Sequence, residues 1–458
     1  MEDMKNGKRS SFSGKLGYVL AAAGASVGLG NIWRFPYLAA KYGGGIFLII
    51  YIVLALTFGY TMIVAETAIG RMTRKSPVGA FKSFGKKKWL SFGGWINAVI
   101  PVLIVPYYSV IGGWVIKYLV EYFRGNAKLL AEDGYFTDFI SNGVSTELCF
   151  VAFCAFTLII IFAGVQNGIE RVSKIMMPIL IVLSVIIAVY SVTRPGALAG
   201  VKYFLVPNVK NFSWMTVVAA MGQMFYSLSI AMGILITFGS YMKKDTAIED
   251  STRNVEIFDT GIAIMAGLMI IPAVFAFSGG DPNTLQAGPS LMFITIPKVF
   301  QNMGFGTVIG IVFFLLVLFA AVTSSIALTE SAVSTFEDEL GWGRKKATVL
   351  VGVIMLALGS LSSLGYGPLA EIKIIGMQFL DLFDFLTNSV MMPIAALLTS
   401  LLVSRVVGID KIEDEIIHGE SAFRRKKVFV VMIKYLCPVF AIIILLSSVA
   451  NALGWIKM

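Results

Sequence analysis

The sequence is poor in the side chains that metal centres and hydrolytic enzymes use most. It has one histidine, His418, and three cysteines, Cys149, Cys154 and Cys437, each within an apolar run. A histidine cluster is therefore excluded by count, and no disulfide framework is predicted. The sequence also offers no pairing of a nucleophile with a base and no cofactor loop, so we do not expect an enzyme.

Charged residues are also scarce. They make up 14% of the 458 residues, whereas hydrophobic residues make up 57%. Soluble domains carry about 25% charged residues, and apolar runs of about 20 residues have the length of a helix that crosses a bilayer. We predict an all-α integral membrane protein with eleven spanning helices near residues 14–40, 45–70, 92–122, 148–165, 172–193, 213–241, 254–278, 305–335, 346–364, 374–403 and 428–452.

The net charge of +10 is unevenly distributed between the predicted loops. With the N-terminus inside, the inner segments contain 25 of the 37 lysines and arginines, and the outer segments contain 9. Because inner loops of membrane proteins are enriched in Lys and Arg, this asymmetry predicts the orientation. The basic charge is thus assigned to topology, and no nucleic-acid partner is expected.

Two of the apolar runs contain glycine and polar residues where a membrane helix is normally continuous. They are GASVGLGNIWRFP at residues 24–36 and GQMFYSLSIAMG at residues 222–233. Unwound backbone at bilayer depth is tolerated where it lines a cavity or binds a solute. Interrupted helices at matching places in two halves point to the binding site of a transporter.

The residues at these interruptions are specific enough to indicate a family. The string GLGNIWRFP at 28–36, followed by GGG at 43–45, resembles the neurotransmitter:sodium symporter family in its bacterial amino-acid transporter branch. Residues 222–229, 323–325, 336–340 and 380–384 resemble, in order, the sixth helix, the eighth helix, the inner gate loop and the tenth helix of that family. The resemblance extends over about residues 9–400.

The resemblance implies a LeuT-type fold with two inverted repeats of five helices. The whole chain, 1–458, is then a single transport domain. Its first repeat is residues 14–193, its second is residues 213–403, and a further helix at 428–452 lies outside them.

The resemblance also implies two sodium sites. The first, which we call the Thr323 site, takes carbonyl and hydroxyl oxygens from Gly24, Val27, Ala320, Thr323 and Ser324. The alternative for its two hydroxyls is a hydrogen bond back to their own helix. The second, which we call the Asp259 site, takes oxygens from Ser26, Asn31, Ser227 and Asp259.

Asp259 stands where the family more often has an asparagine, and Ala263 stands where chloride-dependent members have a serine. A carboxylate at this depth is costly unless a cation neutralises it. We therefore predict sodium dependence without a chloride requirement. The alternative is that Asp259 lies at the inner end of its helix and is solvated.

The position of Gly28 indicates the class of substrate. Monoamine transporters of the family have an aspartate there, which replaces the carboxylate that their substrates lack. By resemblance, the substrate here supplies its own carboxylate and binds as a neutral, mostly apolar L-amino acid. The implied substrate-binding residues are Ser26, Leu29, Gly30, Ile104, Tyr108, Tyr226, Ser229, Met232, Ser324 and Leu328.

Two ion pairs are expected to gate the site by resemblance. Arg34 with Asp384 forms the outer gate, and Arg9 with Asp338 forms the inner gate, with Tyr241 alongside. We expect a multi-pass protein of a bacterial cytoplasmic membrane; the oligomeric state and the identity of the amino acid stay open. Proton-coupled or exchange transport on the same fold is an alternative, as is a transceptor that senses the amino acid without net flux.

Overall fold

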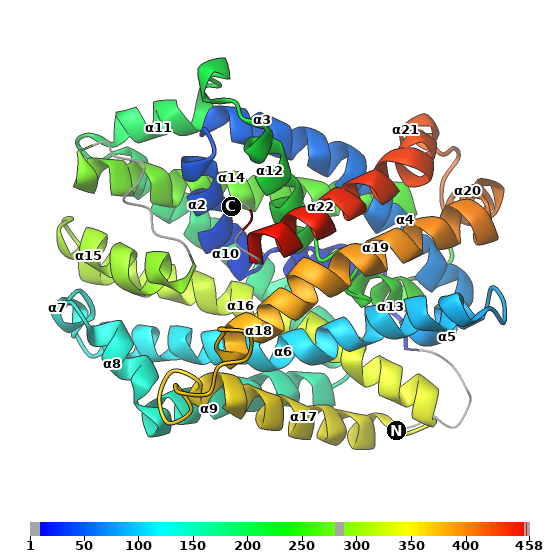
Figure 1. The fold of residues 1–458 in the computed structure, drawn as a ribbon, viewed down its shortest axis with the longest axis horizontal. Helices are drawn as coiled ribbons and strands as arrows, with labels where there is room; N and C mark the ends of the chain where they lie inside the picture. The colour runs from blue at the N-terminus through cyan, green and yellow to red at the C-terminus, as the bar shows by residue number, and fades with distance from the viewer. Residues whose placement is uncertain (1–9, 280–287, 453–454, 456–458) are drawn as a thin grey trace.

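The protein is built from helices that differ greatly in length (Figure 1). The computed structural model describes residues 10–279, 288–452 and 455. Across these residues the regular structure is helical, apart from an isolated bridge between Ile374 and Met377. The fold class expected from the sequence, all-α, is confirmed.

The α-helices in chain order are α1 (Lys15–Ser26), α2 (Phe35–Lys41), α3 (Gly45–Leu54), α4 (Tyr60–Thr73), α5 (Pro77–Lys82), α6 (Lys88–Phe123), α7 (Ala127–Leu130), α8 (Tyr135–Ser141), α9 (Gly143–Phe162), α10 (Arg171–Val192), α11 (Ala197–Leu205), α12 (Trp214–Ser227), α13 (Ile234–Tyr241), α14 (Ile248–Ser278), α15 (Ile296–Gln301), α16 (Gly306–Leu340), α17 (Arg344–Leu364), α18 (Phe379–Asp384), α19 (Met392–Leu401), α20 (Ile409–Ile417), α21 (Lys426–Val431) and α22 (Cys437–Ala452). Wider π-helical turns join several of them, namely η2 (Gly30–Arg34), η3 (Ala55–Gly59), η4 (Val165–Glu170), η7 (Leu291–Thr295), η8 (Phe385–Met391), η9 (Leu402–Val407) and η10 (Met432–Leu436), and η5 (Val209–Asn211) is a short 3₁₀ turn.

Most of the expected spans are long apolar helices in the structure. Nine helices of the described residues are long and apolar enough to cross a membrane, and a tenth forms if the pair Lys15–Ser26 and Gly30–Lys41 is counted as one bent span. The sixth expected span is divided between α12 and α13, neither of which reaches the length of a crossing. The count of eleven and the inside position of the N-terminus stay predictions.

The two divided spans lie in the interior of the bundle. α1 packs against α10, α14 and α16, and α13 packs against α4 and α16. α9 and α17 lie together at one edge, which is the lower edge of the view in Figure 1. The membrane-spanning stretch of α9 is only 39% buried, compared with 78% for that of α6, so α9 presents a wide apolar face to lipid.

Candidate binding sites between the broken helices

The first interruption is short. α1 ends at Ser26 and η2 begins at Gly30. The two halves of this span meet at an angle of 53°. Carbonyl oxygens near the break are therefore released from the helical hydrogen-bond pattern and turned towards neighbouring helices.

The second interruption, residues 228–233, has an unusual backbone. Ser229 and Ala231 adopt positive φ angles of 52° and 57°, a conformation that costs about 1–2 kcal/mol for a residue with a Cβ atom. Two contacts hold it in place: Ser229 Oγ donates to the Ala25 carbonyl at 2.9 Å, and the Ala231 N–H donates to Glu66 Oε1 at 2.7 Å. Glu66, a buried carboxylate of α4, thus accepts a hydrogen bond from the unwound part of the sixth span.

A small cavity of about 30 Å³ lies between the two interruptions. It is lined by all ten residues that the sequence predicts for the substrate, together with three neighbours, Ala25, Gly28 and Asn31. The lining contains no lysine, arginine, aspartate or glutamate, so the walls provide no fixed charge to pair with a charged substrate side chain.

One end of this cavity presents donors that fit a carboxylate. The Leu29 N–H donates to Tyr108 Oη at 3.3 Å, so a backbone amide and a phenol, both from residues predicted to bind the substrate, face one another. A Cβ atom on Gly28 would lie 2.6 Å from Ser324 Oγ and 3.0 Å from Tyr108 Oη. An aspartate at this position would therefore displace both side chains, and the glycine keeps the space open.

Asp259 is fully buried and lies at the centre of a hydrogen-bond cluster. Its Oδ1 accepts from Asn31 Nδ2 at 2.8 Å and from Ser227 Oγ at 2.9 Å, and its Oδ2 accepts from Tyr51 Oη at 2.9 Å. The alternative that Asp259 is solvated at an inner helix end is wrong, because α14 begins at Ile248 and so places this residue about three turns inside the helix. Three side chains of the Asp259 site thus come together, from η2, α12 and α14. Their oxygens and the negative charge fit a sodium ion.

Sequence reasoning missed Tyr51. It lies in α3, whose other residues are glycine and aliphatic or phenylalanine side chains, and its ring packs against Phe35 at a centroid distance of 4.9 Å. A buried tyrosine normally has a partner for its hydroxyl. The hydroxyl of Tyr51 is the one polar side-chain group in an otherwise apolar helix, and this isolation was the signal that could have indicated a buried hydrogen-bond partner.

The Thr323 site is defined by backbone oxygens from two helices. Ser324 Oγ lies 3.3, 3.1 and 3.4 Å from the carbonyl oxygens of Gly24, Ala25 and Val27. Thr323 Oγ1 instead donates to carbonyls of its own helix, at Phe319 and Ala320. The back-bonded alternative therefore describes Thr323, whereas Ser324 bridges α16 to the end of α1. This uncharged set of oxygens fits an alkali cation.

Arg34 and Asp384, the residues predicted for the outer gate, contact other groups in the structure. The Arg34 guanidinium carbon is 5.2 Å from the centroid of the Tyr226 ring. Asp384 accepts from Tyr107 Oη at 3.2 Å and from Asn388. The expected ion pair between Arg34 and Asp384 is not formed in the described part of the chain, because a ring face and two other donors occupy these groups.

At the opposite end, Arg9 lies outside the described residues. Asp338 accepts from the Ser76 N–H at 2.6 Å. Tyr241 packs against Phe12, with ring centroids 6.1 Å apart, and also receives the Phe12 N–H on its carbonyl.

The sequence left open the partner of Glu330. In the structure Glu330 accepts from Tyr241 Oη at 2.7 Å and forms a bidentate pair with Arg344, at 3.0 and 2.6 Å. This cluster joins α13, α16 and the start of α17. It neutralises the charge of a fully buried carboxylate beside Tyr241, a residue predicted for the inner gate.

Comparison with known proteins matches nearly the whole chain to one family. The model of the sodium:neurotransmitter symporter family covers residues 9–130 and 138–455. The chain belongs to the sodium:neurotransmitter symporter family. It is therefore a sodium-dependent transporter and not an enzyme.

Relatives of this transporter include bacterial and animal proteins. It is 34% identical to the sodium-dependent transporter YhdH of Bacillus subtilis (strain 168) over 97% of this chain and 99% of that one. It is 26% identical to the human sodium- and chloride-dependent GABA transporter 2, over 89% of this chain and 75% of that one. Among solved structures, MhsT in complex with L-phenylalanine matches with a TM-score of 0.86 and 35% identity, over 96% of this chain and 100% of that one. The LeuT-type fold expected from the sequence is thereby confirmed.

Proposed function

We propose that this transporter uses the inward sodium gradient to accumulate a neutral, mostly apolar L-amino acid by alternating access across a bacterial cytoplasmic membrane. The observation that carries the proposal is the cavity between the two interruptions, because its lining has donors at one end and no fixed charge elsewhere. The complex of the related MhsT with L-phenylalanine supports this class of substrate. The proposed repeats remain residues 14–193 and 213–403, with 428–452 outside them.

The proposal includes two sodium ions, one at each site. A tenfold sodium gradient contributes about 1.4 kcal/mol per ion, and a potential of about −100 mV contributes about 2.3 kcal/mol per charge. Two ions then supply roughly 7.4 kcal/mol, which corresponds to about 10⁵-fold accumulation of a zwitterion. Coupling arises because Asn31 of the Asp259 site also lines the cavity, so ion and substrate stabilise each other's binding.

We further propose that chloride is not required. The buried Asp259 carboxylate supplies a negative charge at the ion site, and Ala263 offers no hydroxyl to an anion. Equal sodium-driven uptake in chloride and in gluconate is expected. A chloride requirement would reject this part of the proposal.

Uptake into proteoliposomes tests the transport cycle itself. Radiolabelled phenylalanine or leucine should accumulate when sodium is high outside, and should not accumulate when a proton gradient replaces the sodium gradient. Accumulation driven by protons alone would favour the proton-coupled alternative. Sodium-dependent binding without accumulation would favour a transceptor.

A further inference from the structure

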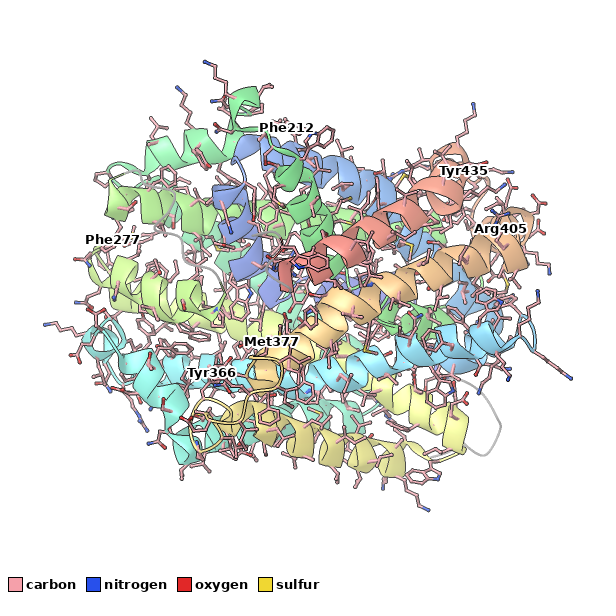
Figure 2. All side chains as sticks on the ribbon, in the orientation of Figure 1. Phe212, Phe277, Tyr366, Met377, Arg405 and Tyr435 are labelled. Carbon is pink, nitrogen blue, oxygen red and sulfur yellow. The ribbon has the colours of Figure 1, made fainter. Side chains whose placement is uncertain are left out.

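A groove between α9 and α17 lies far from the substrate cavity and has no role in the proposed cycle. Two of its lining residues, Asn142 and Glu147, are polar. The others are Gly143 and five apolar residues, Val144, Leu148, Val151, Leu364 and Pro368. Its volume is about 530 Å³ and it opens outwards. Tyr366, labelled in Figure 2, marks the loop that follows α17 at this end of the molecule.

The groove exists because small residues bring its two helices together. A Cβ atom on Gly143 would lie 3.1 Å from both Leu364 and Pro368, and one on Gly359 would lie 2.2 Å from the Phe150 ring. Close approach at these positions leaves the side chains of Val144 and Leu148 projecting beside the gap, 74% and 67% exposed. An apolar channel of this kind suits an acyl chain.

One carboxylate stands at the polar end of the groove. The Ser360 hydroxyl of α17 donates to Oε1 of Glu147, whereas Oε2 is buried and has no hydrogen-bond partner among the described residues. No lysine or arginine in the described part of the chain forms an ion pair with Glu147. A buried carboxylate oxygen without a donor is costly, so a turn of the Glu147 carboxylate into the open groove, where a donor from outside the chain can reach it, would stabilise the group.

The position of Glu147 indicates where that donor comes from. It lies about one turn from the start of α9, and the Lys and Arg distribution places this helix end at the outer face. The carboxylate is therefore at headgroup depth, directly above an apolar groove. An ammonium group has three N–H donors and the complementary charge, whereas a trimethylammonium group has none.

We propose that this groove is a binding site for a phospholipid with a primary ammonium headgroup, such as phosphatidylethanolamine. The headgroup nitrogen donates to Glu147, and one acyl chain lies along Val144, Leu148 and Val151. The site is independent of the substrate cavity, because its residues belong to α9 and α17 and to their flanking loops.

The test compares lipids that differ only in the methylation of the headgroup nitrogen. Purified transporter is mixed with dioleoyl phosphatidylethanolamine, phosphatidylcholine or phosphatidylglycerol, and retained lipid is measured by native mass spectrometry alongside Tm. Because hydrogen bonds to charged groups contribute about 1.5–3 kcal/mol, retention of the ethanolamine lipid should exceed that of the choline lipid by on the order of tenfold. Equal retention of the two, or preference for the glycerol lipid, would overturn the proposal.

Three variants locate the effect. Glu147→Gln should abolish the preference for ethanolamine over choline, while Glu132→Gln, an exposed carboxylate on the same face, should preserve it. Leu148→Trp should reduce retention of both lipids by filling the groove, and its exposure makes a folding defect unexpected. A preference that persists in Glu147→Gln, or a Leu148→Trp variant that retains lipid as the parent does, would contradict the site.

Discussion

Tyr51 and Asp259 are 208 positions apart in the chain, yet the tyrosine hydroxyl donates to the aspartate Oδ2 at 2.9 Å. The bond joins α3 to α14 beside the first interruption. Together with Asn31 and Ser227 it gives the buried carboxylate three donor side chains. The Asp259 carboxylate, the proposed sodium ligand, is therefore held in one orientation by these three side chains.

Removing this donor should destabilise the sodium-free protein. Tyr51→Phe takes one hydrogen bond from a buried charge, a loss of about 1.5–3 kcal/mol. We expect a lower Tm without sodium and a larger rise in Tm when sodium is added, because the ion then partners the freed oxygen. Tyr122→Phe is the matched control, since the buried Tyr122 hydroxyl has no partner among the described residues. Equal Tm values for the two variants would count against the role of Tyr51.

The negative charge itself should set sodium affinity. Asp259→Asn keeps the shape of the side chain and removes the charge that attracts the ion. We expect the sodium concentration for half-maximal substrate binding to rise at least about tenfold, which corresponds to 1.4 kcal/mol. The control is Asp245→Asn, an exposed carboxylate of the loop between α13 and α14. Unchanged sodium activation in Asp259→Asn would show that the carboxylate is not a ligand.

The space at Gly28 should be needed for the substrate carboxylate. Gly28→Ala places a methyl group 2.6 Å from Ser324 Oγ and 3.0 Å from Tyr108 Oη, so one or both must move. We expect amino-acid affinity to fall at least about tenfold, which corresponds to 1.4 kcal/mol. Gly261→Ala, on α14, meets no atom within 4 Å and should bind normally. The measurement is equilibrium binding of labelled amino acid in saturating sodium.

Loss of the Arg344 side chain should leave the buried Glu330 carboxylate without its ion-pair partner. Arg344→Ala leaves Glu330 with Tyr241 as its one remaining donor among the described residues, and breaking a buried pair costs about 3–5 kcal/mol. We expect a clearly lower Tm, partly restored by Glu330→Gln in the same chain. Lys345→Ala, which changes an exposed neighbour, should leave Tm within about one degree of the parent. A Tm of Arg344→Ala equal to that of Lys345→Ala would contradict the pair.

The sequence predicts much of this architecture because the thickness of the bilayer sets the length of the apolar runs, and the orientation of the protein sets the distribution of Lys and Arg between the loops. In the described part of the chain nine expected spans are long helices, and both interruptions lie where glycine and polar residues break the runs. The lining of the cavity was predictable for a different reason: its residues flank those interruptions or occupy positions that a family resemblance supplies.

Contacts between distant segments were harder to predict. Tyr51 lies in a helix without any other polar side chain. Arg344, the partner of Glu330, lies on the next helix, 14 positions further along the chain. Neither pairing has a local pattern. The position of Arg34 over Tyr226 also differs from the expected ion pair, because a ring face competes with a carboxylate for the guanidinium.

The most direct test of the account is equilibrium binding of the twenty amino acids in competition with labelled phenylalanine, with sodium and with potassium in its place. We predict that large apolar amino acids compete in sodium, that charged ones do not, and that binding is lost in potassium. Binding of equal strength in both salts, or competition dominated by lysine or glutamate, would contradict a sodium-coupled cavity without fixed charge.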